Sequence, residues 1–329
     1  MMLQSLRSRL GPVVILAALV LAITPVIAGS AFWLDNSIIV AIFSLLALSV
    51  GMAYGQAGIL SMAPAAFGAI GAFATSIVTA RYGLSPFIGL VLALLLPAVL
   101  AYPMARAITR LSPLPLSIAT LLLSLVLELA IREGGSFTGG YIGISGIPPL
   151  WFAESILAMH VLSWCLVVVV MVLYANLTDS AVGRAVKTAR HDPLRATADG
   201  VNVPALLACY FAISASVAGL AGWLYAHHLT YMGPDSLTMH VSIKIVLMAV
   251  IGGASTLLGP VLGAAFLTLL TLYLPAAETQ GMIFGVVLIF VLLVAPNGVF
   301  GTDWKKMVIK RVAQKSVARR PVASGEGAA

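Results

Sequence analysis

Residues 36–80 read NSIIVAIFSLLALSVGMAYGQAGILSMAPAAFGAIGAFATSIVTA and contain no charged side chain. A membrane helix uses about 20 apolar residues. The 45 residues between Asp35 and Arg81 are therefore too many for one crossing and enough for two. The Gly- and Pro-rich stretch 55–64 is the natural turn between them. This region predicts two membrane helices joined by an irregular break.

The whole chain has the same apolar character. Of its 329 residues, 61% are hydrophobic and 9% are charged, whereas soluble domains carry about 25% charged residues. This composition excludes a water-soluble enzyme, a secreted disulfide scaffold and a disordered chain. The apolar stretches are continuous, while barrel strands alternate apolar and polar residues. Cys165 and Cys209 lie inside apolar stretches, which favours helix packing over a disulfide or a metal site.

The gaps between charged residues predict an all-α polytopic membrane protein with about ten transmembrane helices. The number falls to eight if the segments around 55–64 or 245–258 only re-enter the membrane. We expect a membrane domain over 1–301, an outer loop over 133–156, a polar cytoplasmic segment over 179–204 and a basic, partly disordered tail over 302–329. The expected spans are 12–29, two within 36–80, 82–105, 111–127, 155–178, 204–226, two meeting within 245–277, and 279–302.

The distribution of basic residues orients these spans. With both termini in the cytoplasm, 15 of the 18 Lys and Arg residues fall on the cytoplasmic side, as the positive-inside rule requires. Topology and anionic lipid thus explain the net charge of +7, and no nucleic-acid partner is needed. The N-terminus also resembles a signal peptide. We prefer an uncleaved first helix, because its removal would break the agreement between charge and topology.

The interior offers little for catalysis. The sequence has no phosphate-binding Gly-x-x-x-x-Gly-Lys loop and no His-Glu-x-x-His motif. His227, His228 and His240 lie near one outer loop but lack the spacing of helical metal ligands. We therefore expect no catalytic residue, no metal site and no cofactor bound by this chain.

Two charged residues stand out within the spans. Glu128 and Arg132 are four residues apart, so they can pair on one helix face. We expect an interfacial ion pair, and a substrate or coupling site is the alternative. The lack of another acid at mid-membrane argues against an ion-coupled transporter.

Two Gly/Pro breaks are each followed by a helix of small residues. The first contains Gly58, Ser61, Pro64 and Phe67, and the second contains Gly252, Gly253, Gly259 and Pro260. Irregular backbone at membrane depth must be buried in protein or line a cavity. We interpret the breaks as a repeat that flanks a translocation path, with two ordinary helix turns as the alternative.

The segment 179–204 has Ala and Arg at helical spacing. This pattern predicts short helices on the cytoplasmic face, and Gly200 is placed to end one of them.

Several blocks in the same order resemble a known family, the LivM-type permease subunit of bacterial ABC importers for branched-chain amino acids. The resemblance covers about 38–301. One block departs from the pattern, because Ser61-Met-Ala-Pro64 stands where the family usually has Ser-Leu-Gly-His or a close variant. The blocks are Gly58-x-Leu-Ser61, Thr138-Gly-Gly140, Gly143-Ile-x-Gly-Ile-Pro148, Ser180-x-x-Gly-Arg-Ala185, Ala218-Gly-Leu-Ala-Gly-x-Leu-Tyr225, Gly252-Gly253, Gly259-Pro260 and Pro296-x-Gly298.

The resemblance implies the transmembrane domain of an ABC importer in the bacterial inner membrane, moving branched-chain or other apolar amino acids inward by alternating access. ATP and Mg²⁺ would be bound by two separate ATP-binding cassette subunits. A second, homologous permease would complete a heterodimer, and a periplasmic binding protein would meet the outer loop. The alternatives are a permease for urea or short amides, an ion-coupled secondary transporter and an intramembrane enzyme.

The resemblance also assigns the polar segment to coupling with the ATPase. Arg184 and Arg190 would face acidic residues of that subunit, and Gly200 would allow a tight turn in the dock. The coupling residues implied are Gly183, Arg184, Arg190, Asp192, Ala196 and Gly200.

Overall fold

The computed structural model describes all residues except 1, 109–112, 274–276, 296–297, 300 and 302–329. The tail predicted over 302–329 lies outside the described residues. Helices make up nearly all the regular structure, as predicted for an all-α membrane protein. The N-terminal half contains α1 (Met2–Ile27), α2 (Ala31–Val50), the π-helix η1 (Gly51–Gln56), α3 (Pro64–Ser76), the π-helix η2 (Ile77–Arg81), α4 (Pro86–Ile108), α5 (Pro113–Glu133), α6 (Gly135–Thr138) and strand β1 (Ile144–Ser145).

The C-terminal half is also mainly helical. It contains α7 (Ile156–Asp179), α8 (Ala181–His191), α9 (Pro193–Ala198), α10 (Val203–Leu229), strand β2 (Tyr231–Met232), α11 (Met239–Gly252), α12 (Gly259–Leu272) and α13 (Ala277–Val294). Both predicted breaks separate helices, because α3 begins at Pro64 and α12 begins at Gly259. The predicted fifth span stops too early, since α5 continues to Glu133 and carries both Glu128 and Arg132.

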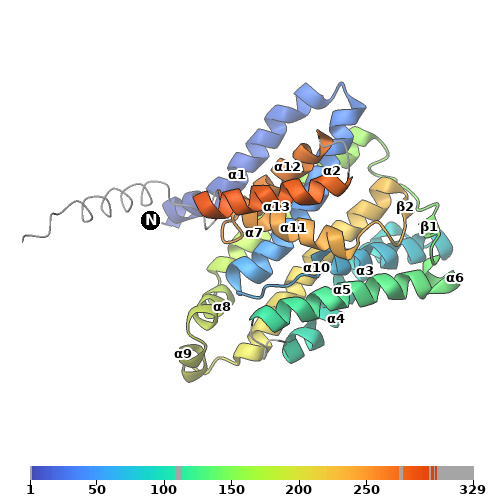
Figure 1. Cartoon of the computed structure of the whole chain (residues 1–329). Helices are drawn as coiled ribbons and strands as arrows, with labels where there is room; N and C mark the ends of the chain where they lie inside the picture. Colours follow the sequence, from blue (N-terminus) through green and yellow to red (C-terminus); the bar gives the residue numbers. More distant parts are fainter. Residues whose placement is uncertain (1, 109–112, 274–276, 296–297, 300, 302–329) are drawn as a thin grey trace, which may run out of the picture.

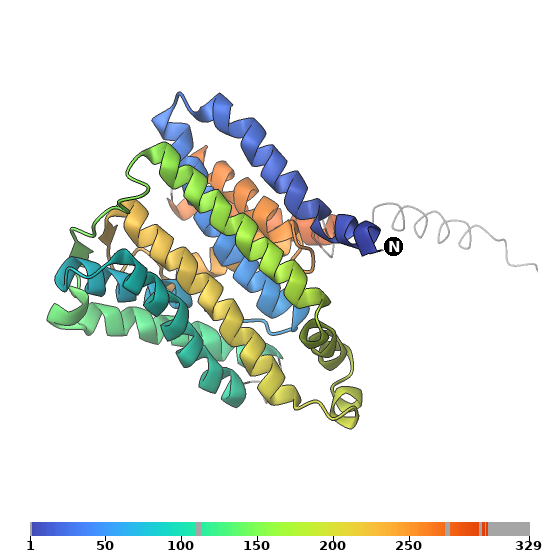
Figure 2. The same cartoon turned by 180° about the vertical axis from the view of Figure 1, so that it is seen from behind.

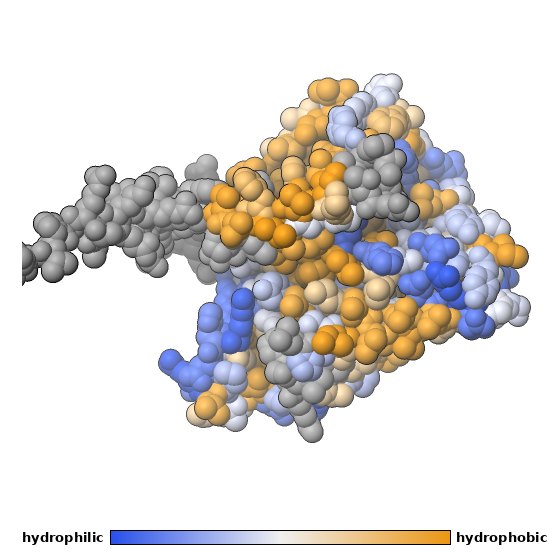
Figure 3. Space-filling view, viewed as in Figure 1, coloured by the Kyte–Doolittle hydropathy of each residue, from blue (hydrophilic) through white to orange (hydrophobic). Residues whose placement is uncertain are grey.

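The segment 179–204 and the loop 133–156 lie at opposite ends of the molecule. In Figure 1, α8 and α9 occupy one end, while α6, β1 and β2 occupy the other. Figure 2 shows α1, α7 and α10 running side by side between these ends. Figure 3 shows hydrophobic side chains over the middle of one face and hydrophilic side chains gathered toward both ends. This distribution suits a protein that crosses a bilayer.

Helix α2 is the centre of the bundle. Its Ile38, Ile42 and Leu45 are fully buried, and it packs against α7, α10, α11 and α12. By contrast, α4 and α5 expose a row of large apolar side chains, including Val99 and Val126. Exposed apolar side chains are stable where lipid surrounds them.

Close contact between α10 and its neighbours depends on small residues. A Cβ atom added to Gly219 would lie 1.9 Å from the Ala93 carbonyl oxygen of α4. One added to Gly222 would lie 1.9 Å from the Gly68 carbonyl oxygen of α3. Such approach of helix backbones is how membrane helices pack without a hydrophobic driving force.

The lengths of the helices bear on the number of crossings. Within the described residues, five helices are long and apolar enough to span a membrane: Ala31–Gln56, Pro86–Ala107, Pro115–Glu133, Ile156–Asp179 and Val203–Leu229. Four apolar helices are shorter. Among these, α11 and α12 have 14 residues each, or about 21 Å of helix against a hydrocarbon core of about 30 Å.

The loop between α5 and α7 is more ordered than a plain loop. Strand β1 pairs antiparallel with β2, with Ile144 opposite Met232 and Ser145 opposite Tyr231. The Ile147 amide also donates to the Thr230 carbonyl at 3.2 Å. The loop predicted over 133–156 is therefore anchored to the segment that follows α10.

Candidate translocation cavity and coupling segment

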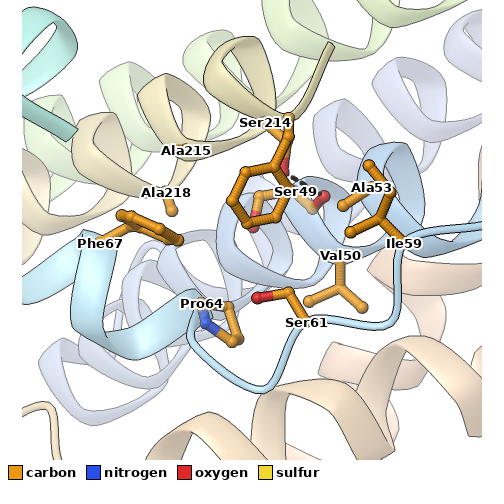
Figure 4. Close-up of a pocket in the computed structure, with 11 residues that line it drawn as sticks. Ser49, Val50, Ala53, Ile59, Ser61, Pro64, Phe67, Ser214, Ala215 and Ala218 are labelled. Atoms are coloured by element: carbon orange, nitrogen blue, oxygen red, sulfur yellow. Dashed lines mark hydrogen bonds between the residues drawn. The ribbon is translucent and has the colours of Figure 1, made fainter. Parts of the chain in front are cut away.

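A small cavity lies where α2 and η1 end and α3 begins. Its walls come from α2, η1, the following loop, α3 and α10 (Figure 4). The room between the side chains is about 10 Å³, roughly that of one water molecule. The cavity is therefore closed to anything as large as an amino acid. The lining residues are Ser49, Val50, Ala53, Ile59, Ser61, Pro64, Phe67, Phe211, Ser214, Ala215 and Ala218.

The chemistry of this cavity is apolar with a few hydroxyls and no charged side chain. Ser214 donates to the Ser49 carbonyl oxygen at 2.8 Å, and Phe67 meets Phe211 edge to face with ring centroids 5.6 Å apart. The Ser61 hydroxyl accepts from the Ala63 amide at 3.2 Å. These walls fit an apolar or neutral group better than an ion.

The loop from Ala57 to Ala63 is held at both ends. At its start, the Gly58 and Ile59 amides donate to the Tyr54 and Ala53 carbonyls at 3.1 and 2.9 Å. At its far end, the Met62 amide donates to Thr120 Oγ1 at 2.9 Å. Ser124 Oγ in turn donates to the Met62 carbonyl at 3.2 Å. The loop therefore links the end of η1 to α5.

Only some of the residues predicted to line a translocation path line this cavity. Ser61, Pro64 and Phe67 line the cavity, whereas Gly58 lies outside it. Gly252, Gly253, Gly259 and Pro260 do not line it either.

The glycines of the second break make backbone contacts instead. A Cβ on Gly252 would meet the Gly259 carbonyl oxygen at 1.9 Å. A Cβ added to Gly51 would lie 2.9 Å from Pro260 Cγ, and one added to Gly55 would lie 1.9 Å from the Ala254 carbonyl oxygen. The two breaks thus touch each other, but the second supports the first by packing.

Sequence reasoning missed eight of the eleven lining residues. Three of the eight are polar or aromatic, namely Ser49, Phe211 and Ser214. All three lie inside long helices, where isolated serines and phenylalanines are common. Only the crossing of α2 and α10 brings them to the break.

The polar segment 179–204 folds into two short helices, α8 and α9, as its spacing predicts. Ser180 caps α8 by accepting from the Gly183 amide at 3.1 Å. A Cβ on Gly183 would come within 2.3 Å of the Leu177 carbonyl oxygen, so α8 turns tightly from the end of α7. Asp192 caps α9 by accepting from the Arg195 amide at 3.0 Å.

The end of the segment 179–204 also shows why its residue types are needed. Ala196 is 1% exposed and packs inward. Gly200 follows α9 with φ of +82°, which is the left-handed conformation that favours glycine.

The two arginines of α8 differ in their contacts. Arg184 is exposed, and its Nη1 donates to the Asp179 carbonyl at 2.8 Å. Whereas the resemblance assigns Arg190 to a partner's acidic surface, its Nη1 donates to the Gly55 carbonyl oxygen of the same chain.

At the opposite end, Glu128 and Arg132 form the expected contact at 2.9 Å. Arg132 also pairs with Asp235 at 2.6 Å. Glu128 Oε2 accepts from the Met239 amide at 3.2 Å, at the start of α11. These contacts join α5, the segment after β2 and α11.

The neighbouring His227 and His228 contact different partners. His227 Nε2 lies 2.9 Å from Thr75 Oγ1, and its Nδ1 lies 2.8 Å from the Pro148 carbonyl oxygen. His228 instead faces Asp35 at 2.9 Å. In the part of the chain that the structure describes, no group of three or more His, Cys, Asp or Glu residues suits a metal ion.

Comparison with known proteins shows which sequences the chain is similar to. Residues 33–292 match the sequence profile described as "Branched-chain amino acid transport system / permease component". The chain is 24% identical over 329 aligned residues to the high-affinity branched-chain amino acid transport system permease protein LivM of Escherichia coli K12, covering 92% of this chain and 77% of that protein. It is also 24% identical to the probable branched-chain amino acid transport permease protein LivH of Methanocaldococcus jannaschii, covering 85% and 95% of the two chains. No solved structure matches the chain.

Proposed function

The chain belongs to the family of permease components of branched-chain amino acid transport systems, and we propose that it carries apolar amino acids inward through the cavity between α2, α3 and α10. It is a LivM-type permease, a multi-pass inner-membrane component of an ABC transporter that works with other transporter subunits. We place ATP and Mg²⁺ on two partner ATP-binding cassette subunits. No cofactor is assigned to this chain.

The observation that carries this proposal is the uncharged wall of the cavity. Phe67 and Phe211 offer an apolar surface, and Ser49, Ser61 and Ser214 lie beside them. A branched side chain suits such a surface, because burial of apolar area is favourable. Urea or a short amide remains the second candidate, since hydroxyls and backbone groups suffice to bind it. The change to Ala63 and Pro64 at the break is where a difference in substrate would arise.

Transport through a closed cavity requires a second conformation. We propose alternating access, in which the helices around the cavity move as rigid bodies. The separate ATPases would drive this motion through α8 and α9. Leu194 supports this docking role, because its apolar side chain is 84% exposed on α9.

The remaining partners follow from the two polar ends. We place α8, α9 and both termini in the cytoplasm, and the β1–β2 end outside. There Tyr141, Ile142 and Trp151 are 69%, 84% and 66% exposed, a surface that a periplasmic binding protein can cover. A second, homologous permease would pair with this chain as a heterodimer.

The number of crossings belongs to the same proposal. We keep ten, with the short helices α11 and α12 crossing where the bundle surrounds them. Lipid fills the space around α4 and α5.

Affinity purification of the tagged protein from its native membrane in mild detergent tests this assignment. Two ATP-binding cassette proteins and a second permease should co-purify, with ATPase activity in the eluate. Purification of the chain alone, with solute movement under an ion gradient in ATP-free liposomes, would support a secondary transporter instead.

A further inference from the structure

Two backbone carbonyls of η1 accept hydrogen bonds from side chains of distant helices. Backbone amides satisfy the carbonyls of Met52, Ala53 and Tyr54 as the chain leaves the helix. Tyr174 of α7 donates to the Gly51 oxygen at 3.0 Å, and Arg190 of α8 donates to the Gly55 oxygen.

Arg190 also covers the loop that follows η1. Gly58 has φ of +74°, and a Cβ atom there would lie 3.2 Å from Arg190 Cγ and 3.6 Å from Nε. The side chain therefore lies against Gly58 while its guanidinium holds Gly55. Arg190 of α8 thus contacts the chain both before and after the turn, at Gly55 and at Gly58.

The contact between Arg190 and Gly58 is close to the cavity. Gly58 precedes Ser61 by three residues, at most about 10 Å of chain, and both Ile59 and Ser61 line the cavity. The far end of the loop is fixed to α5 through Thr120 and Ser124. A displacement of α8 therefore acts on a short segment that is anchored at its other end.

We propose that Arg190 is a positioning residue that transmits movement of the coupling helix α8 to the cavity loop 57–63. This role rests on the proposed function, because a partner must move α8. It differs from docking, since the guanidinium binds a carbonyl of its own chain. Arg184 on the same helix donates to the Asp179 carbonyl instead.

The test uses Arg190→Gln, with Arg190→Lys as the conservative variant and Arg106→Gln as the matched control. Arg106 is another exposed arginine, whose Nη1 lies 3.4 Å from the Tyr102 hydroxyl of its own helix. Each variant is purified with its partner subunits, and ATP hydrolysis and leucine uptake into liposomes are measured. Arg190→Gln should retain assembly and hydrolysis but lose about tenfold in uptake, within the range of typical coupling between sites.

Arg190→Lys should recover part of the uptake, because its ammonium can still donate to the Gly55 carbonyl. Arg106→Gln should behave as the unaltered protein. Uptake at the unaltered level in Arg190→Gln would overturn the inference. Loss of assembly in Arg190→Gln would also overturn it, because the residue would then act in docking or folding.

A second readout does not depend on the substrate. In a Cys165→Ala, Cys209→Ala background, the rate of labelling of Ser61→Cys by a small thiol reagent is compared with and without ATP and vanadate. The rate should change with Arg190 present and stay constant with Arg190→Gln, whereas equal changes in both would contradict the inference. If the complex shows this Arg190-dependent change but takes up no leucine, the proposed substrate is wrong and the link stands.

Discussion

At the scale of single residues, glycines allow helix backbones to approach closely, because they have no side chain. Gly222 faces the Gly68 carbonyl oxygen so closely that an added Cβ would lie 1.9 Å from it. A Cβ atom added to Gly281 of α13 would have no heavy atom of the described residues within 4 Å. The two glycines look alike in the sequence but serve different purposes.

Gly222→Ala should therefore lower thermal stability in detergent, because overpacking costs about 1–3 kcal/mol. Gly281→Ala should be neutral or raise stability slightly, since alanine is favoured over glycine in a helix by about 0.5–1 kcal/mol. The melting temperature of each variant is measured by heating samples in detergent and following the loss of the folded peak by size-exclusion chromatography. Equal melting temperatures for both variants would contradict the packing of α10 on α3.

A charged residue gives a second prediction at this scale. Glu128 is 15% exposed and Arg132 is 29% exposed, and Arg132 keeps Asp235 as a partner if Glu128 is neutralised. Glu128→Gln should therefore cost little stability, about 0–1 kcal/mol for such a partly exposed pair, and should leave leucine uptake intact. A folded variant without uptake would instead favour the coupling or substrate role of this pair.

At the scale of elements, α9 exposes an apolar side chain to water. Leu194→Asp should weaken retention of the ATPase subunits during purification, because a charge would enter the buried contact. Leu194→Met, which conserves the apolar volume, should retain them. If both variants retain the subunits equally, α9 does not dock there.

The sequence predicts individual elements well where the physics is local. The breaks at 55–64 and between Gly252 and Pro260, the short helices of 179–204 and the position of Gly200 all follow from Gly, Pro and helical spacing. It predicts poorly where the physics is tertiary. Ser49, Phe211 and Ser214 reach the cavity only through the crossing of α2 and α10, and the partner of Arg190 is 135 residues away.

At the scale of the whole molecule, the two polar ends should lie on opposite sides of the membrane. In the background without Cys165 and Cys209, Tyr141→Cys should react with an impermeant thiol reagent added outside intact cells. Leu194→Cys should react only after the membrane is opened. Reaction of both from outside would contradict the orientation and the proposed set of crossings.

The most direct test of the central claim is leucine uptake by the purified complex in sealed liposomes, with ATP supplied on the side of α8 and α9 and the binding protein on the other. Uptake should require ATP and should be unaffected by dissipation of ion gradients. Uptake that continues without ATP and follows an imposed ion gradient would contradict the assignment as an ABC permease.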